Sequence, residues 1–152
     1  MRSTKVYQHI GAPRDRVYRA LIDPASVAHW KVPDGMSCQI HEFDAREGGS
    51  LRISLTYHSS DRAGKTLAHT DTYRGRFLRL ALNEEVVELD SFETADPTMQ
   101  GEMRITIKLM DVPDGTELIA IHEGLPPGVA LSDNELGWRM ALEKLAVLVE
   151  AR

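Results

Sequence analysis

The sequence of 152 residues contains a single cysteine, Cys38, and no long run of apolar residues. One cysteine cannot form an internal disulfide, which favours a protein of a reducing compartment. A chain without about 20 consecutive apolar residues is not expected to span a bilayer, and the first ten residues lack the apolar run of a secretory signal peptide. We therefore expect a soluble, cytoplasmic protein with no membrane insertion.

The chain also lacks an excess of basic residues. It has 18 Lys and Arg against 23 Asp and Glu, which gives a formal net charge of -5. Binding to nucleic acid requires a basic face that displaces counterions from phosphates. We therefore expect no nucleic-acid partner, and the same charge disfavours an anionic membrane surface.

Motifs for metals and cofactors are missing as well. The six histidines are scattered, and no spacing among them matches a zinc site. The sequence has no nucleotide-binding glycine pattern and no nucleophile elbow. We expect neither a metal nor a cofactor.

The patterns that are present predict one α+β domain over residues 1–152. Apolar residues make up 42% of the chain and charged residues 27%, as in ordinary globular domains. The clearest strand alternates Leu51, Ile53, Leu55 and Tyr57 with polar residues. In chain order we expect a strand at 4–10, helices at 13–22 and 25–30, strands at 38–43, 51–58, 68–80, 85–92, 102–109 and 116–122, and a long final helix.

The final helix is expected to cover an antiparallel sheet. Ser132 and Glu135 have the spacing of a capping box at its start. One apolar stripe follows, made of Trp138, Ala141, Leu142, Leu145, Leu148 and Val149. A curved sheet packed on one helix leaves a hollow at its open end, which is the expected site.

Short motifs run in order along nearly the whole chain. They are Ala12-Pro13-Arg14, Val17-Tyr18-Arg19-Ala20-Leu21, Asp23-Pro24, Trp30 with Pro33-Asp34-Gly35, the segment 44–49, Gly75 with Phe77, the segments 115–118 and 122–125, and Gly137-Trp138 with Leu142 and Leu145. Together they resemble the START-like (SRPBCC) superfamily and, within it, the family homologous to the activator of the heat-shock protein 90 ATPase.

The resemblance implies a helix-grip fold. A curved antiparallel sheet of about seven strands would wrap around the C-terminal helix, with two short helices after the first strand and a hydrophobic cavity between sheet and helix. Proteins with this fold bind lipids, hormones or polyketides, and some act on them as cyclases or aromatases, so the resemblance does not imply one activity.

Twelve residues are candidate ligand contacts. Apolar surface is expected from Trp30, Leu51, Ile53, Leu55, Tyr57, Phe77, Met103 and Trp138. Tyr57, His69, Asp71, Tyr73 and His122 are expected to orient the polar end of the ligand, and Gly75 between Tyr73 and Phe77 indicates a bulge or a close contact. The plainer alternatives are core packing for the tryptophans and Met103, a hydrogen-bonded structural role for His122, and a solvated strand end for His69 and Asp71.

The leading hypothesis is a protein that holds a small hydrophobic or amphipathic ligand in this cavity. One alternative is a cofactor-free enzyme, a cyclase, dehydratase or hydrolase, that uses His122 or the His69–Asp71 pair for proton transfer. Another is a chaperone-associated interaction domain that binds through its outer helix face. A second apolar ridge on the final helix and two outward strand positions also suggest a homodimer through Leu136, Met140, Val147, Ile119 and Ile121.

Overall fold

Alternation of buried and exposed side chains builds the strands of one sheet. The clearest case is the strand Gly115–Glu123, which buries Thr116, Leu118, Ala120 and His122 and turns the residues between them to the other face. The computed structural model describes residues 2–58 and 70–151 of the chain.

Seven strands pair antiparallel in the order β1-β7-β6-β5-β4-β3-β2. Their bounds are β1 Ser3–Ile10, β2 Met36–Phe43, β3 Ser50–Tyr57, β4 Thr70–Ala81, β5 Glu85–Phe92, β6 Met103–Val112 and β7 Gly115–Glu123. The helices are α1 Arg14–Ile22, α2 Pro24–Trp30 and α3 Leu131–Glu150, and a 3-10 turn spans Pro97–Met99. The predicted element order and the helix-grip architecture are confirmed.

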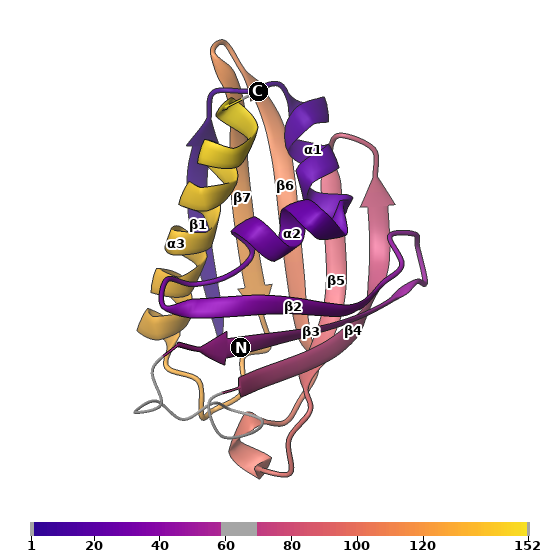
Figure 1. Cartoon of the computed structure of the whole chain (residues 1–152), viewed down its shortest axis with the longest axis vertical. Helices are drawn as coiled ribbons and strands as arrows, with labels where there is room; N and C mark the ends of the chain where they lie inside the picture. The colour runs from indigo at the N-terminus through magenta and orange to yellow at the C-terminus, as the bar shows by residue number, and fades with distance from the viewer. Residues whose placement is uncertain (1, 59–69, 152) are drawn as a thin grey trace.

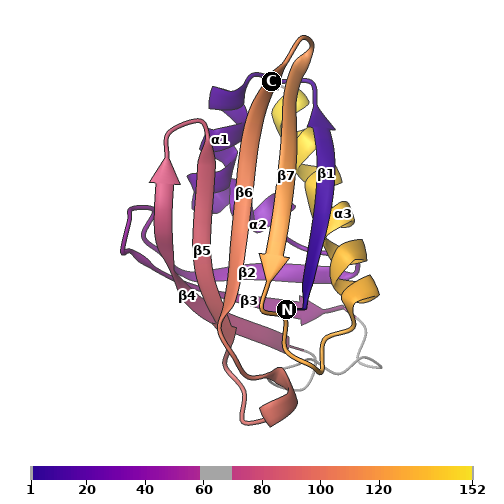
Figure 2. The ribbon, with the colours of Figure 1, turned by 180° about the vertical axis from the view of Figure 1, so that it is seen from behind.

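The sheet is strongly bent, and all three helices lie on its concave face. Figure 1 shows β2 and β3 crossing the direction of β5, β6 and β7, while Figure 2 shows the opposite face of the sheet without helices. The register shifts between Phe77 and Arg79 on β4, and such a bulge increases the local bend. Because of this bend, β2 and β3 border the concave space on one side and α3 borders it on the other.

The predicted apolar stripe of α3 forms the centre of the core. Leu142 and Leu145 are fully buried, and they pack in one cluster with Val6, Ile10 and Leu118 of the sheet. Leu148 is half-buried at the margin of this cluster. Burial of large aliphatic side chains of this kind contributes about 1.5–3 kcal/mol each, so this packing fixes α3 on the sheet.

The predicted capping box is wrong. The helix begins at Leu131 with Ala130 as its N-cap, and no side chain caps it. Ser132 therefore lies inside the first turn, where its hydroxyl is not in the capping position. Within the described residues, no helix has both the length and the apolar character needed to cross a membrane.

Candidate functional site

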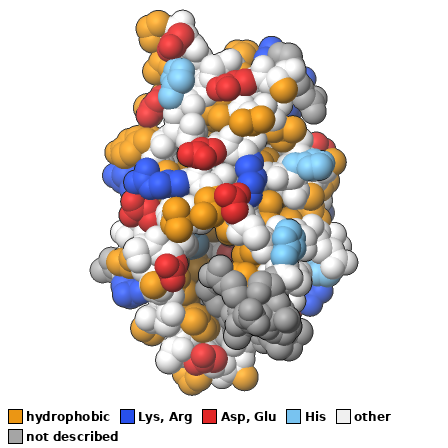
Figure 3. Space-filling view, turned by 60° about the vertical axis from the view of Figure 1, so that its left-hand side comes forward, with side chains coloured by type: hydrophobic (Ala, Val, Ile, Leu, Met, Phe, Trp, Pro, Cys, Tyr) orange, Lys and Arg blue, Asp and Glu red, His pale blue; other side chains and the backbone are white. Residues whose placement is uncertain are grey.

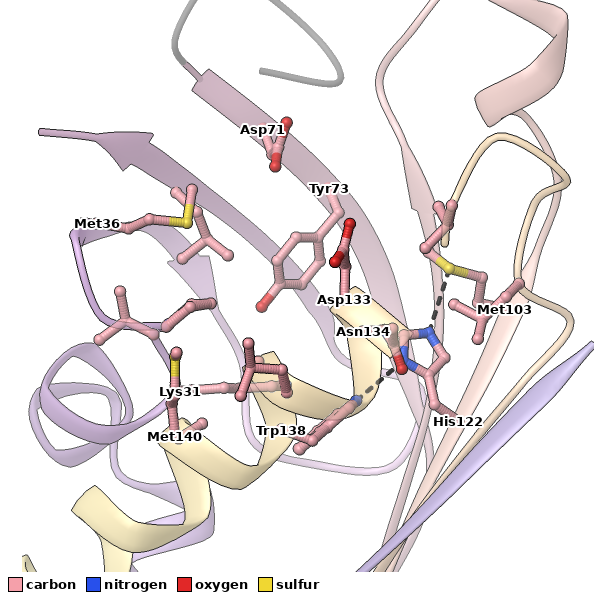
Figure 4. A pocket seen from close by; sticks show the side chains of 18 of the residues that line it. Lys31, Met36, Asp71, Tyr73, Met103, His122, Asp133, Asn134, Trp138 and Met140 are labelled. Carbon is pink, nitrogen blue, oxygen red and sulfur yellow. Dashed lines mark hydrogen bonds between the residues drawn. The ribbon is translucent and has the colours of Figure 1, made fainter. Parts of the chain in front are cut away.

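A pocket of about 450 Å³ lies between the concave face of the sheet and the first half of α3. Most of its wall is apolar and comes from β3, β5, β6, the loop after β7 and α3; examples are Leu55, Phe92, Ile105, Leu125 and Met140. Figure 4 shows Tyr73, His122 and Trp138 around this space, with Lys31 approaching from the segment after α2. Its size falls in the range of about 300–1,000 Å³ that is usual for small-molecule sites.

The inner face of the sheet changes from apolar to polar across one row of paired residues. Val86, Ile107, Ala120 and Val6 stand side by side in successive strands. The next inward-facing row is made of Phe77, Glu88, Ile105, His122 and Thr4, and beyond it lie Gly75, Asp90 and Met103. The pocket therefore borders a polar part of the sheet, where β5 places Glu88 and Asp90 on the inner face and Asp90 reaches the lining.

Glu88 is held by Lys31. The Lys31 ammonium donates a hydrogen bond to Glu88 Oε1 at 2.6 Å, and the two side chains are 12% and 6% exposed. Burial alone would lower the pKa of Lys31, but the Glu88 charge outweighs it and keeps that pKa above its usual value. Burial likewise acts to raise the pKa of Glu88, and the Lys31 charge reverses this, so the net pKa is lowered. The pair is ionised at neutral pH.

Asp90 is the exception on this wall. Asp90 lines the pocket and is only 2% exposed, and neither carboxyl oxygen accepts a hydrogen bond in the described part of the chain. Burial and then the neighbouring Glu88 carboxylate raise the pKa of Asp90 well above its usual value. Two carboxyl groups therefore share one cation, Lys31, and Asp90 is the one whose ionisation is disfavoured.

The close contact predicted at Gly75 is confirmed, and its cause is Asp90. A Cβ atom built on Gly75 would lie 2.1 Å from Asp90 Oδ1 and 2.1 Å from the backbone oxygen of Leu89. Any larger residue would have to displace the neighbouring strand. Glycine thus gives the Asp90 carboxyl group its space.

His122 is fixed as a neutral imidazole. Its Nδ1 accepts hydrogen bonds from Trp138 Nε1 at 3.1 Å and from the Asn134 amide at 3.2 Å, so the proton must sit on Nε2, which faces Met103 Sδ at 3.2 Å. Figure 4 marks the contacts of His122 with Trp138 and with Met103. Burial and then the Lys31 charge lower the pKa of His122 to about 4. A histidine whose Nδ1 is occupied and whose pKa is this low is poorly suited to proton transfer at neutral pH.

Seven of the twelve candidate residues line the pocket: Leu55, Tyr57, Asp71, Tyr73, Met103, His122 and Trp138. Four others, Trp30, Leu51, Ile53 and Phe77, are instead packed in the core. Their burial has a physical reason, since α1 and α2 cover that part of the sheet, and the Trp30 indole donates to the Ala20 carbonyl at 2.9 Å. His69 lies outside the described residues, so the His69–Asp71 pair stays a prediction.

The sequence did not indicate Lys31, Glu88 or Asp90 as site residues. Val86, Val87 and Glu88 are consecutive and all buried, so the strand has no simple alternation from which its inner face could be assigned. The one available signal was Gly75, because a glycine within a strand often marks a close approach by another group. Among the described residues, no three His, Cys, Asp or Glu side chains are placed to hold a metal ion.

The residues proposed for a homodimer do not share one face. Leu136 and Met140 line the pocket, and Val147 is 69% exposed on α3. Ile119 and Ile121 are half-buried on the convex face of β7, opposite to the side that α3 covers. Apolar side chains are interspersed with charged ones on the face drawn in Figure 3. Self-association through these residues stays a prediction.

Comparison with known proteins identifies related sequences and structures. The model of the family described as Activator of Hsp90 ATPase homolog 1-like protein matches residues 11–150. A crystal structure of a protein from Chromobacterium violaceum is 32% identical with a TM-score of 0.88, and the match covers 97% of this chain and 96% of that one. Among curated protein sequences, the comparison found no match.

Two more distant structures share the fold. A protein from Rhodobacter sphaeroides is 22% identical with a TM-score of 0.80, and the match covers 98% of this chain and 92% of that one. An AHSA1-like protein from Aeromonas hydrophila is 16% identical with a TM-score of 0.73, with 99% and 93% covered. The resemblance inferred from the sequence motifs is confirmed.

Proposed function

Since the chain belongs to the family of Activator of Hsp90 ATPase homolog 1-like proteins, we propose that it binds one small amphipathic molecule between its sheet and α3. The observation that carries this proposal is the pocket of about 450 Å³, which combines a mostly apolar lining with a polar wall. Binding sites for small molecules have this composition, because apolar burial gives affinity and a few fixed polar groups give orientation.

The apolar part of the ligand would lie against Met103, Ile105 and Trp138. Each methylene group that it buries there contributes about 0.8 kcal/mol. The polar part would meet Tyr73 and Asp71, which line the pocket from β4. Burial raises the pKa of Tyr73, so its phenol stays neutral and can donate a hydrogen bond.

Native mass spectrometry of protein purified from its own host tests the proposal. A bound small molecule is expected, and Leu55→Trp should abolish it because the indole would occupy the pocket. Leu82→Trp makes the same change at a residue that is 73% exposed in the β4–β5 turn, and it should retain the molecule. The proposal is refuted if the wild-type protein carries no molecule and binds no amphipathic probe, or if Leu55→Trp and wild type bind equally.

A second candidate is a cofactor-free enzyme that uses the same pocket. The observation in its favour is that the pKa of Glu88 is lowered and that of Asp90 is raised within one strand. Two neighbouring acids whose pKa values are shifted in opposite directions are typical of general acid–base sites. The proton donor would then be Asp90 and not His122. Loss of a reaction in Asp90→Asn with unchanged substrate binding would support this function.

The cytoplasmic location and the homodimer expected from the sequence stay predictions. Size-exclusion chromatography with light scattering tests the second, because Val147→Asp would reduce the dimer fraction if α3 formed the contact.

A further inference from the structure

The polar wall of the pocket carries more acidic than basic groups. Among the described lining residues the only Lys or Arg is Lys31, and it is bound to Glu88. The acids that line the pocket are Asp34, Asp71, Asp90 and Asp133, of which Asp34 is paired with Lys144 at 2.7 Å. Among the described lining residues, acidic side chains therefore outnumber basic ones, which disfavours an anionic ligand.

Within this wall, no donor among the described residues reaches the Asp90 carboxyl group. Asp90 is 2% exposed, it borders the pocket, and in the part of the chain that the structure describes neither of its oxygens accepts a hydrogen bond. In that part of the chain its protonated form can donate only to the neighbouring Glu88 carboxylate. A buried carboxyl group in this state costs free energy, and native proteins normally satisfy such groups. The space around it is also preserved, because Gly75 leaves room for Oδ1 that a Cβ atom would fill.

We infer that the ligand of this pocket is a cationic amphiphile, an amine on an apolar body, and that Asp90 is the ion-pair partner of its ammonium group. The inference rests on the proposed function, since it specifies the ligand of the same pocket. An ammonium group would provide a second cation beside Lys31 and would allow Asp90 to ionise. Asp71, also 2% exposed, adds a second carboxyl group to the pocket wall.

Binding of an amine would be linked to proton release. The charged and titratable groups around Asp90 are Glu88 on its own strand, Lys31 after α2 and Tyr73 on β4, while Met103 on β6 adds no charge. Burial and Glu88 raise the pKa of Asp90, so the free protein favours the protonated acid more than an exposed aspartate does. The bound state would pair Asp90 carboxylate with the ammonium, and the displaced proton would pass to solvent. Affinity for an amine should therefore rise with pH.

Titration calorimetry with three matched probes tests the inference: 1-naphthylmethylamine, 1-naphthylmethanol and 1-naphthoate. We expect the amine to bind about tenfold or more tightly than the alcohol, as a charge-assisted hydrogen bond allows, and the carboxylate to bind least. Asp90→Asn should remove the preference for the amine and leave the alcohol within about twofold. Asp114→Asn, the same change at a residue in the β6–β7 turn whose side chain is 81% exposed, should behave as wild type.

The outcomes separate this inference from the proposed function. Equal binding of amine and alcohol by the wild-type protein would overturn the inference and leave the binding pocket supported. Preference for the carboxylate would overturn it as well and would mean that neutral Asp90 donates a hydrogen bond. Absence of binding by all three probes would count against both proposals. If Asp90→Asn does not fold, the ratio of amine to alcohol affinity in the wild-type protein decides, and a ratio near one contradicts the inference.

Discussion

Replacing Lys31 by methionine removes the cation from a buried pair of acids and tests how the polar wall is held together. The Lys31–Glu88 hydrogen bond is 2.6 Å long, and the two side chains are 12% and 6% exposed. Loss of one partner of a buried ion pair costs about 3–5 kcal/mol, because the other charge remains buried and unpaired. Against a typical total of about 5–15 kcal/mol, Lys31→Met should remove a large part of the free energy of unfolding at pH 7.

The loss should depend on pH in a defined direction. The pKa of Glu88 is lowered in the folded protein, because Lys31 outweighs the effect of burial. The stability that this pair contributes is therefore fully present above the pKa of an unfolded glutamate, about 4.3, and is lost as the pH falls through the folded value. Without Lys31, burial raises the pKa of Glu88, and the variant regains stability when the acid is protonated. The difference between wild type and variant should narrow between pH 7 and pH 4.

Urea unfolding monitored by circular dichroism measures both effects. The double variant Lys31→Met with Glu88→Gln removes both charges and should recover much of the loss, which gives a coupling free energy for the pair. Lys5→Met makes the same replacement at an exposed position of β1 and should change the midpoint little. If the free energy of unfolding of Lys31→Met at pH 7 lies within about 1 kcal/mol of the wild-type value, the Lys31–Glu88 pair does not stabilise this part of the sheet.

Further predictions concern the groups around the pocket. Gly75→Ala should destabilise the fold by about 2 kcal/mol or more, because its Cβ atom would lie 2.1 Å from Asp90 Oδ1. Gly137→Ala should instead stabilise α3 by about 0.5–1 kcal/mol, because its Cβ atom would lie 3.5 Å from its nearest neighbour. Thermal unfolding compares the two variants, and equal effects would contradict the reasoning. His122→Phe leaves the Trp138 indole and Asn134 without their acceptor and should cost about 1–3 kcal/mol at pH 7. The pKa of His122 is lowered to about 4 in the folded protein, so its contribution to stability is present above about pH 6.5 and is lost as the pH falls toward 4. The free energy of unfolding of His122→Phe should therefore depend less on pH than that of wild type. An unchanged pH dependence would refute the neutral state assigned to His122. Asp90→Asn should be as stable as wild type or more stable at neutral pH, since a raised acid pKa means that folding disfavours the ionised group; lower stability in urea unfolding would show that Asp90 has a structural partner.

The fold was predictable because each helix and strand has a recognisable pattern within its own segment of the sequence. On β7 every second residue from Thr116 to His122 is buried, and the turn at Pro113-Asp114-Gly115 separates it cleanly from β6. The stripe of α3 likewise has one clear helical period, and Leu142 and Leu145 are fully buried as expected. Such signals need only neighbouring residues, and the family motifs then gave the arrangement of the elements.

The site was only partly predictable, since its contacts join residues far apart in the sequence. Lys31 and Glu88 are separated by 57 positions, and no local pattern pairs them. The inner face of β5 could not be assigned because Val86, Val87 and Glu88 are all buried. The alternation of residues along the strands correctly predicted that Asp71, Tyr73 and His122 face inward. It could not predict that α1 and α2 fill the space beside Leu51 and Ile53.

The polar rows of the sheet explain why one unsatisfied group is informative. Where the inner face is apolar, α3 covers it with apolar side chains, and nothing further is required. In the polar rows each group needs a partner: Thr4 donates to Asn134 at 2.6 Å, His122 accepts from Trp138, and Glu88 accepts from Lys31. Three polar groups on three strands are thus satisfied by side chains from α3 and the α2–β2 segment. Asp90 lies one row further along the sheet and borders the pocket, and among the described residues neither of its oxygens accepts a hydrogen bond. This is the observation from which we infer that a ligand supplies its partner.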